Sequence, residues 1–132
     1  MPLYSIHGIN PRISWDVEST DQFGDWYVDL SEAGQAAIQA TVNRLIALGP
    51  NLRFPHSSGI NNSRHSHMRE LRIQSGGRPL RIFYAFDPRR SAILLIGGDK
   101  TGDDRFYERM IPVADELYDV YLQELRQEGL IK

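Results

Sequence analysis

The chain lacks cysteine, so none of its 132 residues can form a disulfide bond, a thiolate metal site or a cysteine nucleophile. This absence suits a reducing cytosol. Long apolar runs are also missing, because the longest, residues 92–96, is far too short to span a bilayer. The first residues lack the basic region and following apolar run of a signal peptide. We therefore expect a cytoplasmic protein that does not enter the membrane.

Internal repeats, low-complexity tracts and linkers are absent too. The composition, 41% hydrophobic and 24% charged, is typical of a globular domain. Since 132 residues suffice for one apolar core, we expect one domain over residues 1–132. The glycine pairs at 76–77 and 97–98 lack the spacing and the following helix of a phosphate-binding loop. We therefore expect no cofactor.

Charge is distributed unevenly along the chain. The formal net charge is −2, which by itself argues against a nucleic-acid-binding protein. However, residues 64–109 carry ten basic and six acidic residues, whereas residues 1–63 and 110–132 are each acidic by three charges. The positive charge is thus concentrated where strands are predicted, and we expect a local anion-binding face there. The alternative is that these arginines are scattered over a solvated face of the sheet.

The first half of the chain predicts a strand and two helices. Residues 13–17 alternate between apolar and polar, as in a strand. Thr20 or Asp21 can cap a short helix, and Ser31 can cap a second helix that ends at Gly49. The side chains expected to pack into the core from these helices are Phe23, Trp26, Tyr27, Leu30, Ile38, Val42, Leu45 and Ile46.

The middle of the chain predicts three strands joined by tight turns. After a long loop at residues 49–67, the strands are expected at residues 68–74, 80–86 and 92–96. A Gly-Gly segment and an Asp-Pro segment supply the two turns. The third strand contains no polar residue, which suits a central strand covered on both sides.

The end of the chain predicts a loop and a helix. Residues 97–102 are expected to form a loop that leads to Lys100 through two glycines, followed by a helical turn from Asp103 or Asp104. Pro112 is expected in the first turn of a last helix, where proline is tolerated. The side chains expected to be buried from that helix are Val113, Leu117, Val120 or Tyr121, and Leu125. The sum is an α+β fold, with helices packed on an antiparallel sheet.

Arginines lie within the predicted strands, which is costly in a small sheet unless that face meets an anion. Side chains on one face of neighbouring strands lie about 5 Å apart between Cβ atoms. Arg72 and Arg81 are therefore expected side by side if residues 75–79 form a hairpin turn. The guanidinium group binds phosphate through two parallel hydrogen bonds, which makes phosphate the leading candidate. A surface salt bridge with Glu70 is the alternative.

Several segments together carry a family resemblance. They are Ser63-Arg64-His65, Met68-Arg-Glu-Leu-Arg, Gly77-Arg-Pro-Leu-Arg-Ile-Phe-Tyr-Ala-Phe-Asp-Pro, Ile93-Leu-Leu-Ile-Gly-Gly-Asp-Lys-Thr-Gly, Arg105-Phe-Tyr-Glu and Ile111-Pro-Val-Ala. In this combination the chain resembles the RelE/ParE toxin superfamily, and within it the HigB-like, phage-derived toxins of type II toxin–antitoxin systems. The resemblance covers roughly residues 15–125, and residues 1–12 form an extension outside it.

The resemblance implies a RelE-like fold and a toxin that cleaves messenger RNA on the translating ribosome. It also implies a small cognate antitoxin, expected to be a helix-turn-helix protein, that holds the toxin inactive. ParE-like branches share the fold but poison DNA gyrase without cutting RNA, so the fold alone leaves both activities open. The closer HigB-like pattern and the dense basic face favour the ribosome-dependent endoribonuclease. The alternatives are a non-enzymatic gyrase-inhibiting toxin and a non-toxic nucleic-acid-binding regulator.

Metal-independent RNA cleavage needs positive charge at the phosphorane, a base for the 2′-hydroxyl and an acid for the leaving 5′-oxygen. We expect Arg72 and Arg81 to bind the scissile phosphate, and Arg81 matches an arginine of the ribonucleolytic relatives. Lys100 is expected to stabilise the phosphorane or move a proton, with ordinary loop solvation as the alternative. Tyr107 falls where some relatives have a catalytic or base-stacking tyrosine, although core packing would also explain it. Glu70 is a second candidate for the base, or a structural partner of a neighbouring arginine.

Three further arginines, Arg64, Arg69 and Arg78, are expected to contact the backbone of ribosomal RNA. The four histidines, at positions 7, 56, 65 and 67, match no standard zinc spacing, so no metal site is expected. The chain departs from the histidine-bearing HigB pattern, because its C-terminal third contains no histidine. His67, next to the second predicted strand, is the one histidine considered as a proton donor.

Overall fold

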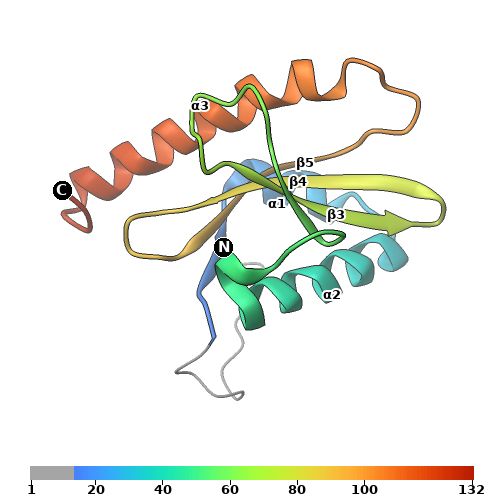
Figure 1. The fold of residues 1–132 in the computed structure, drawn as a ribbon, viewed down its shortest axis with the longest axis horizontal. Coiled ribbons are helices and arrows are strands. Elements are labelled where there is room, and N and C mark those ends of the chain that lie inside the picture. Colours follow the sequence, from blue (N-terminus) through green and yellow to red (C-terminus); the bar gives the residue numbers. More distant parts are fainter. Residues whose placement is uncertain (1–13) are drawn as a thin grey trace.

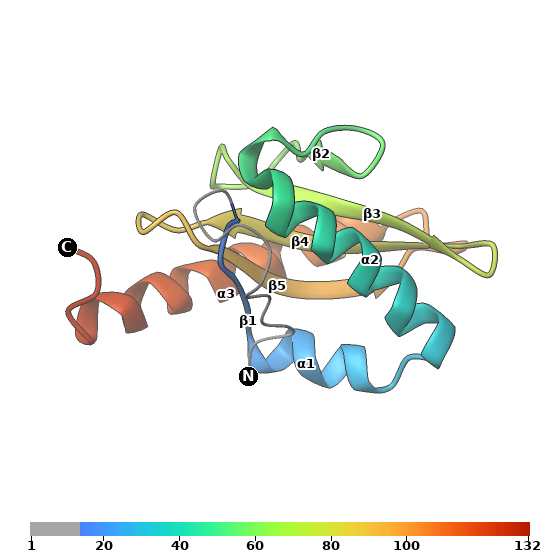
Figure 2. The same ribbon diagram turned by 90° about the horizontal axis from the view of Figure 1, so that it is seen from below.

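A computed structural model describes residues 14–132 as one sheet with helices on both faces (Figure 1, Figure 2). Its elements are β1 (Val17–Ser19), α1 (Asp21–Val28), α2 (Glu32–Leu48), the short 3-10 helix η1 (Gly49–Asn51), β2 (Ser57–Gly59), β3 (Arg69–Ser75), β4 (Arg78–Phe86), β5 (Ala92–Asp99) and α3 (Phe106–Gln127). The predicted extension at residues 1–12 and the start of the predicted first strand, Ile13, lie outside the described residues. Within residues 14–132 no helix is long and apolar enough to cross a membrane.

The sheet has the strand order β1-β5-β4-β3-β2. Neighbouring strands from β5 to β2 run antiparallel, whereas β1 pairs with β5 in parallel. The predicted α+β fold is confirmed, and the antiparallel arrangement is wrong only for the β1–β5 pair. β1 begins at Val17, the last residue of the strand predicted from the sequence. β2 is a short edge strand inside the region predicted as a loop, and it lacks the apolar alternation that would have revealed it.

Helices α1 and α2 begin where the sequence predicts. Thr20 Oγ1 accepts a hydrogen bond from the backbone N–H of Phe23 at 3.0 Å, and Ser31 Oγ accepts one from that of Gly34 at 3.1 Å. Both helices cover the same face of the sheet (Figure 2). The buried residues of this side are Val17, Phe23, Ile38, Val42, Leu45, Ile46, Leu52, Leu71, Ile73, Leu80, Ile82, Tyr84, Ala92 and Leu94.

Helix α3 covers the opposite face of the sheet (Figure 1). The buried residues of this second core are Met68, Phe83, Ala85, Ile93, Leu95, Phe106, Ile111, Ala114 and Tyr118. Side chains alternate between the faces of a strand. Because Leu71 and Ile73 of β3 pack towards α2, Glu70 and Arg72 face α3.

Helix α3 differs from the prediction at its start and in its buried face. It runs from Phe106, so Pro112 lies inside the helix rather than in its first turn. The turn predicted at Asp103 does form, since the N–H of Phe106 donates to the carbonyl oxygen of Asp103 at 3.3 Å, and it leads directly into α3. An interior proline removes one backbone hydrogen bond of a helix. Burial of Phe106 against the sheet nevertheless favours a helical conformation both before and after Pro112. Val113 and Val120 are 42% and 49% exposed, so of the two alternatives Val120 and Tyr121 it is Tyr121 that packs against the core. The predicted Leu117 is also partly buried there, and the predicted Leu125 is buried. The other buried residues of α3 are Phe106, Ile111, Ala114, Asp115 and Tyr118.

Strand β5 is longer than predicted, because Gly97 and Gly98 continue the strand instead of opening a loop. Their missing side chains let two helices approach the sheet. A Cβ atom on Gly97 would lie 2.2 Å from the ring of Trp26, and one on Gly98 would lie 2.8 Å from the ring of Phe106. These glycines therefore set how closely α1 and α3 pack at this end of the sheet.

Candidate active site beneath the start of α3

Arg72 and Arg81 lie side by side on the α3 face of the sheet. They are direct partners in the register of the antiparallel β3–β4 pair, as the sequence predicted. Gly76 and Gly77 form the hairpin turn with φ angles of 58° and 78°, which glycine adopts without strain. The register of this hairpin brings the two guanidinium groups to one place.

The carboxylate of Glu70 lies between these cations. Its Oε2 accepts a hydrogen bond from Arg72 Nη1 at 3.1 Å, and its Oε1 accepts one from the hydroxyl of Tyr107 at 2.7 Å. Arg81 Nε lies 3.7 Å from Oε1, which is an ion pair but not a hydrogen bond. The Glu70 side chain is only 5% exposed. Hydrogen bonds to a buried charge are strong, so Glu70 orders the groups around it.

Arg81 is a buried cation with incomplete hydrogen bonding. The residue is 6% exposed, and its Nη1 donates to the carbonyl oxygen of Leu80 at 3.0 Å. In residues 14–132, its Nε is the one buried side-chain nitrogen or oxygen without a hydrogen-bond partner. Native structures keep few such groups, and each costs about 1–3 kcal/mol. This arrangement is typical of a functional position rather than of one selected for stability alone.

Tyr107 lies in the first turn of α3 and joins the core to this site. Its ring packs edge-on against Phe83 and Phe106, with centroid distances of 6.1 and 5.3 Å. Burial raises the pKa of its hydroxyl above the ordinary value of 10, the bond to Glu70 raises that pKa further, and Arg81 lowers it less. The phenol therefore stays protonated at neutral pH and acts as a hydrogen-bond donor.

Lys100 follows β5 directly and reaches the same group of residues. Its backbone N–H donates to the carbonyl oxygen of Pro79 at 3.0 Å, so its backbone is tied to β4 instead of lying in the expected glycine loop. The ammonium nitrogen lies 5.8 Å from the ring centroid of Tyr107, within reach of a cation–π interaction.

These five residues, Glu70, Arg72, Arg81, Lys100 and Tyr107, are called the arginine cluster below. The cluster contains three cations and one carboxylate, which leaves two excess positive charges at one place. Paired guanidinium groups on rigid strands match the oxygens of a phosphate group. The arrangement can therefore bind a phosphodiester and stabilise negative charge that develops on it.

The three arginines predicted to contact ribosomal RNA lie outside the arginine cluster. Arg64 forms an ion pair with Asp119 of α3. Arg69 faces the α2 side of the sheet, where its Nε donates to a serine hydroxyl of β2 at 3.0 Å. Arg78 lies at the hairpin turn, 3.3 Å from Asp99. Arg64 and Arg78 keep 61% and 59% of their side chains exposed, so an RNA backbone can reach both.

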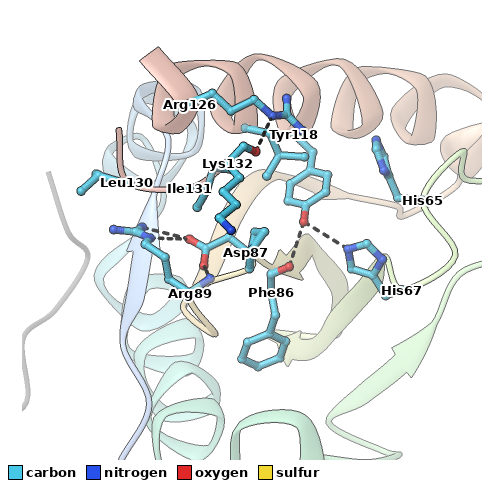
Figure 3. A pocket seen from close by; sticks show the side chains of 12 residues that line it. His65, His67, Phe86, Asp87, Arg89, Tyr118, Arg126, Leu130, Ile131 and Lys132 are labelled. Carbon is cyan, nitrogen blue, oxygen red and sulfur yellow. Dashed lines mark hydrogen bonds and ion pairs between the residues drawn. The ribbon is translucent and has the colours of Figure 1, made fainter. Parts of the chain in front are cut away.

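A cavity of about 620 Å³ lies near the C-terminal half of α3, away from the arginine cluster, and both His65 and His67 line it (Figure 3). There the hydroxyl of Tyr118 donates to the carbonyl oxygen of Phe86 at 2.8 Å and lies 3.1 Å from Nε2 of His67. Burial and the nearby His65 lower the pKa of His67 below 6.5. Tyr118 is about three helical turns from Tyr107, so His67 faces a different part of α3 from the arginine cluster.

The segment 60–68 links β2 to β3 and reaches α3 on the way (Figure 1). A residue that sequence reasoning missed anchors it there. Asp115, 3% exposed on α3, accepts hydrogen bonds from the hydroxyl of Ser63 at 2.5 Å and from the backbone N–H of Arg64 at 3.0 Å. A carboxylate on a helix normally indicates a solvated face. Only the contact of Asp115 with residues about fifty positions earlier in the chain reveals that its carboxylate holds a loop.

The sequence of the chain is similar to those of known proteins. The sequence profile of the family described as phage-derived protein Gp49-like matches residues 25–119, which include the whole arginine cluster. The chain is 40% identical over 92 residues to the candidate toxin HigB3 of Mycobacterium tuberculosis, covering 69% of this chain and 79% of that relative. It is 33% identical over 114 residues to the candidate toxin HigB2 of the same organism, covering 85% of this chain but 56% of that relative's length. The chain therefore belongs to the phage-derived Gp49-like family, as a HigB-like toxin of a toxin–antitoxin system.

Proposed function

We propose that this toxin is a metal-independent endoribonuclease that cuts mRNA on the translating ribosome through the arginine cluster. The main support is the pairing of Arg72 and Arg81 around one buried carboxylate, with Lys100 beside them. A phosphodiester gains negative charge as it becomes a phosphorane. Cations already fixed on rigid strands stabilise that charge without having to reorganise during the reaction.

In the proposed reaction, a ribose 2′-oxygen attacks the adjacent phosphorus and the 5′-oxygen of the next nucleotide leaves. The products are a 2′,3′-cyclic phosphate end and a 5′-hydroxyl end. The 2′-hydroxyl loses one proton and the leaving oxygen gains one, so the reaction consumes no cofactor. Arg72, Arg81 and Lys100 supply the positive charge at the phosphorane, and the protonated hydroxyl of Tyr107 turns its one hydrogen bond from Glu70 to the phosphorane.

Glu70 acts in this proposal as a positioning residue. Both of its oxygens are engaged, one by Arg72 and the other by Tyr107. Arg81 Nε, in contrast, is 3.7 Å away and makes no hydrogen bond. The buried guanidinium of Arg81 can therefore turn towards an arriving phosphate without breaking a hydrogen bond between Arg81 and Glu70.

The ribosome supplies affinity that the toxin alone lacks. The chain has a net charge of −2, and binding to free nucleic acid depends strongly on excess positive charge. We expect the ribosome to present the mRNA to the arginine cluster, with Arg64 and Arg78 contacting ribosomal RNA and Arg69 reachable only if its bond to β2 is broken. The antitoxin is expected to be a small helix-turn-helix protein encoded by the neighbouring gene, and the toxin itself to form one domain.

Mapping of transcript ends after toxin induction tests the proposal directly. RNA ends should be phosphorylated before ligation, so that 5′-hydroxyl ends are captured. We expect new 5′-hydroxyl ends inside translated reading frames within minutes, and none when translation initiation is blocked. A supercoiling assay with purified gyrase should show no inhibition. Inhibited gyrase with intact transcripts would instead support the ParE-like alternative, and harmless overexpression without antitoxin would support a regulator.

Replacing Tyr107 by phenylalanine should lower the cleavage rate roughly 10- to 100-fold, because the ring stays packed while the hydrogen-bond donor is lost. The measurement is single-turnover cleavage on ribosomes programmed with a short mRNA. Tyr27→Phe is a matched control, since Tyr27 donates to the carbonyl oxygen of Gln35 at 3.3 Å on the other side of the sheet. An unchanged rate in Tyr107→Phe would leave this residue with a packing role only.

A further inference from the structure

A cavity of about 400 Å³ adjoins the arginine cluster, between α3 and the segment 60–68. The residues that line it are Asn62, Tyr107, Glu108, Ile111 and Pro112. Tyr107 belongs to both places, because its hydroxyl binds Glu70 while the residue also forms part of the cavity wall. A group in this cavity therefore contacts the same tyrosine that borders the proposed phosphate site.

The lining of the cavity suits a flat, uncharged ring better than a second phosphate. Tyr107, Ile111 and Pro112 provide aromatic and apolar surface, on which nucleobases stack readily. Among the described residues, the cavity wall contains no cation that would bind a phosphate, and its one charged residue is the acidic Glu108. Arg105 fixes its carboxylate, with Nη2 2.7 Å from Oε1 and Nε 3.2 Å from Oε2.

The two polar side chains of the cavity differ in hydrogen-bonding capacity. The amide of Asn62 offers one acceptor oxygen and one donor nitrogen, whereas the carboxylate of Glu108 only accepts. A base with an exocyclic amino group, such as adenine, cytosine or guanine, can donate to these oxygens. Uracil has no amino group, and its single donor, the N3–H, is flanked by two carbonyl oxygens that a carboxylate repels.

The backbone at Asn62 is held in place before any RNA arrives, and its exposed amide can meet a base. Its φ angle of 71° is left-handed, a conformation that asparagine tolerates better than most residues. The next two residues, Ser63 and Arg64, are bound to the buried carboxylate of Asp115. The cavity is therefore formed by the fold itself, as in most small-molecule sites, and its volume lies within their usual range.

We propose that this cavity binds the nucleobase next to the scissile phosphate and selects bases with an exocyclic amino group over uracil. This proposal rests on the endoribonuclease function above. A good pair of hydrogen bonds to a base favours it over a wrong base by about 1–3 kcal/mol, which is a ratio of affinities of roughly fivefold or more. We therefore expect uracil to be depleted at least about fivefold, relative to the transcripts, at one nucleotide adjacent to the cuts.

The test maps 5′-hydroxyl ends in cells that produce the wild type, Asn62→Gly or Glu108→Gln. Glycine accepts the backbone conformation of residue 62, so Asn62→Gly removes the amide without strain. We expect this variant to cut less and with uracil depletion below about twofold. The Glu108→Gln amide can donate to a uracil carbonyl, so this variant should accept uracil. Asn61→Gly is the matched control, because the exposed Asn61 is not part of the cavity wall.

The outcomes separate the two proposals. If the wild type makes no cuts, the endoribonuclease function fails and the base-binding site fails with it. If the wild type cuts but shows no depletion of uracil beside the cut, the function stands and the base-binding site is wrong. The base-binding site is also wrong if the depletion persists in both Asn62→Gly and Glu108→Gln.

Discussion

Replacing Arg81 and Lys100 together by alanine is expected to abolish growth arrest and mRNA cleavage. Removing one preorganised group that stabilises transition-state charge typically costs about 10²–10³ in rate. Losing both cations should therefore slow cleavage by roughly 10³-fold or more, below what arrests growth. The measurements are growth after induction without antitoxin and single-turnover cleavage on programmed ribosomes. Co-purification with the cognate antitoxin checks that the variant still folds.

The chain offers a matched control for this double variant. Arg44→Ala with Lys132→Ala removes the same two residue types from exposed positions, on α2 and at the C-terminal end. Lys132 is the one lysine besides Lys100 in the sequence. This control should arrest growth as the wild type does. Continued arrest and cleavage in the Arg81→Ala, Lys100→Ala variant would remove both residues from the mechanism.

Glu70→Ala should lower the free energy of unfolding by roughly 3 kcal/mol. Removing one partner of a buried ion pair typically costs 3–5 kcal/mol, because the other charge stays buried without compensation. In this variant the charge of Arg81, with 7% of its side chain exposed, would be left buried without a carboxylate partner. We expect a value near the low end, since the Nε–Oε1 distance of 3.7 Å indicates a loose pair and Arg72 can still reach solvent. Chemical denaturation of the purified toxin measures the loss.

A double variant separates loss of charge balance from loss of packing. Combining Glu70→Ala with Arg81→Met removes both charges and keeps apolar volume, so it should recover most of the lost stability. Glu18→Ala is a suitable control, because its ion pair with Arg89 is largely exposed and should contribute less than about 1 kcal/mol. A cost below about 1 kcal/mol for Glu70→Ala itself would show that this carboxylate does not order the cluster.

The pairing of Arg72 with Arg81 was predictable because it depends on local rules. Side chains alternate along a strand with a period of two, and the Gly-Gly segment permits a tight turn. The register of the hairpin followed from these two facts. The caps at Thr20 and Ser31 were predictable for the same reason, since a cap needs only a hydroxyl and an N–H three residues later.

Other features depended on contacts that a single segment does not encode. Gly97 and Gly98 indicated a loop, yet they continue β5 because rings of α1 and α3 occupy the space of their missing side chains. Pro112 indicated the start of a helix, yet burial of Phe106 extends α3 before it. Val113 of α3 was wrongly predicted to be buried, because a helix takes its exact orientation from the surface on which it packs.

The sequence alone determined the fold class and the concentration of arginine in the strands, since these follow from residue order and short-range periodicity, and its resemblance to known toxins indicated the family. Only the tertiary structure decided that Glu70 joins Arg72 and Arg81 to Tyr107, that Lys100 lies against the Tyr107 ring, and that Arg69 faces away. The physical reason is that these contacts join β3, β4, β5 and α3. Their geometry is set when two separate cores pack against opposite faces of one sheet.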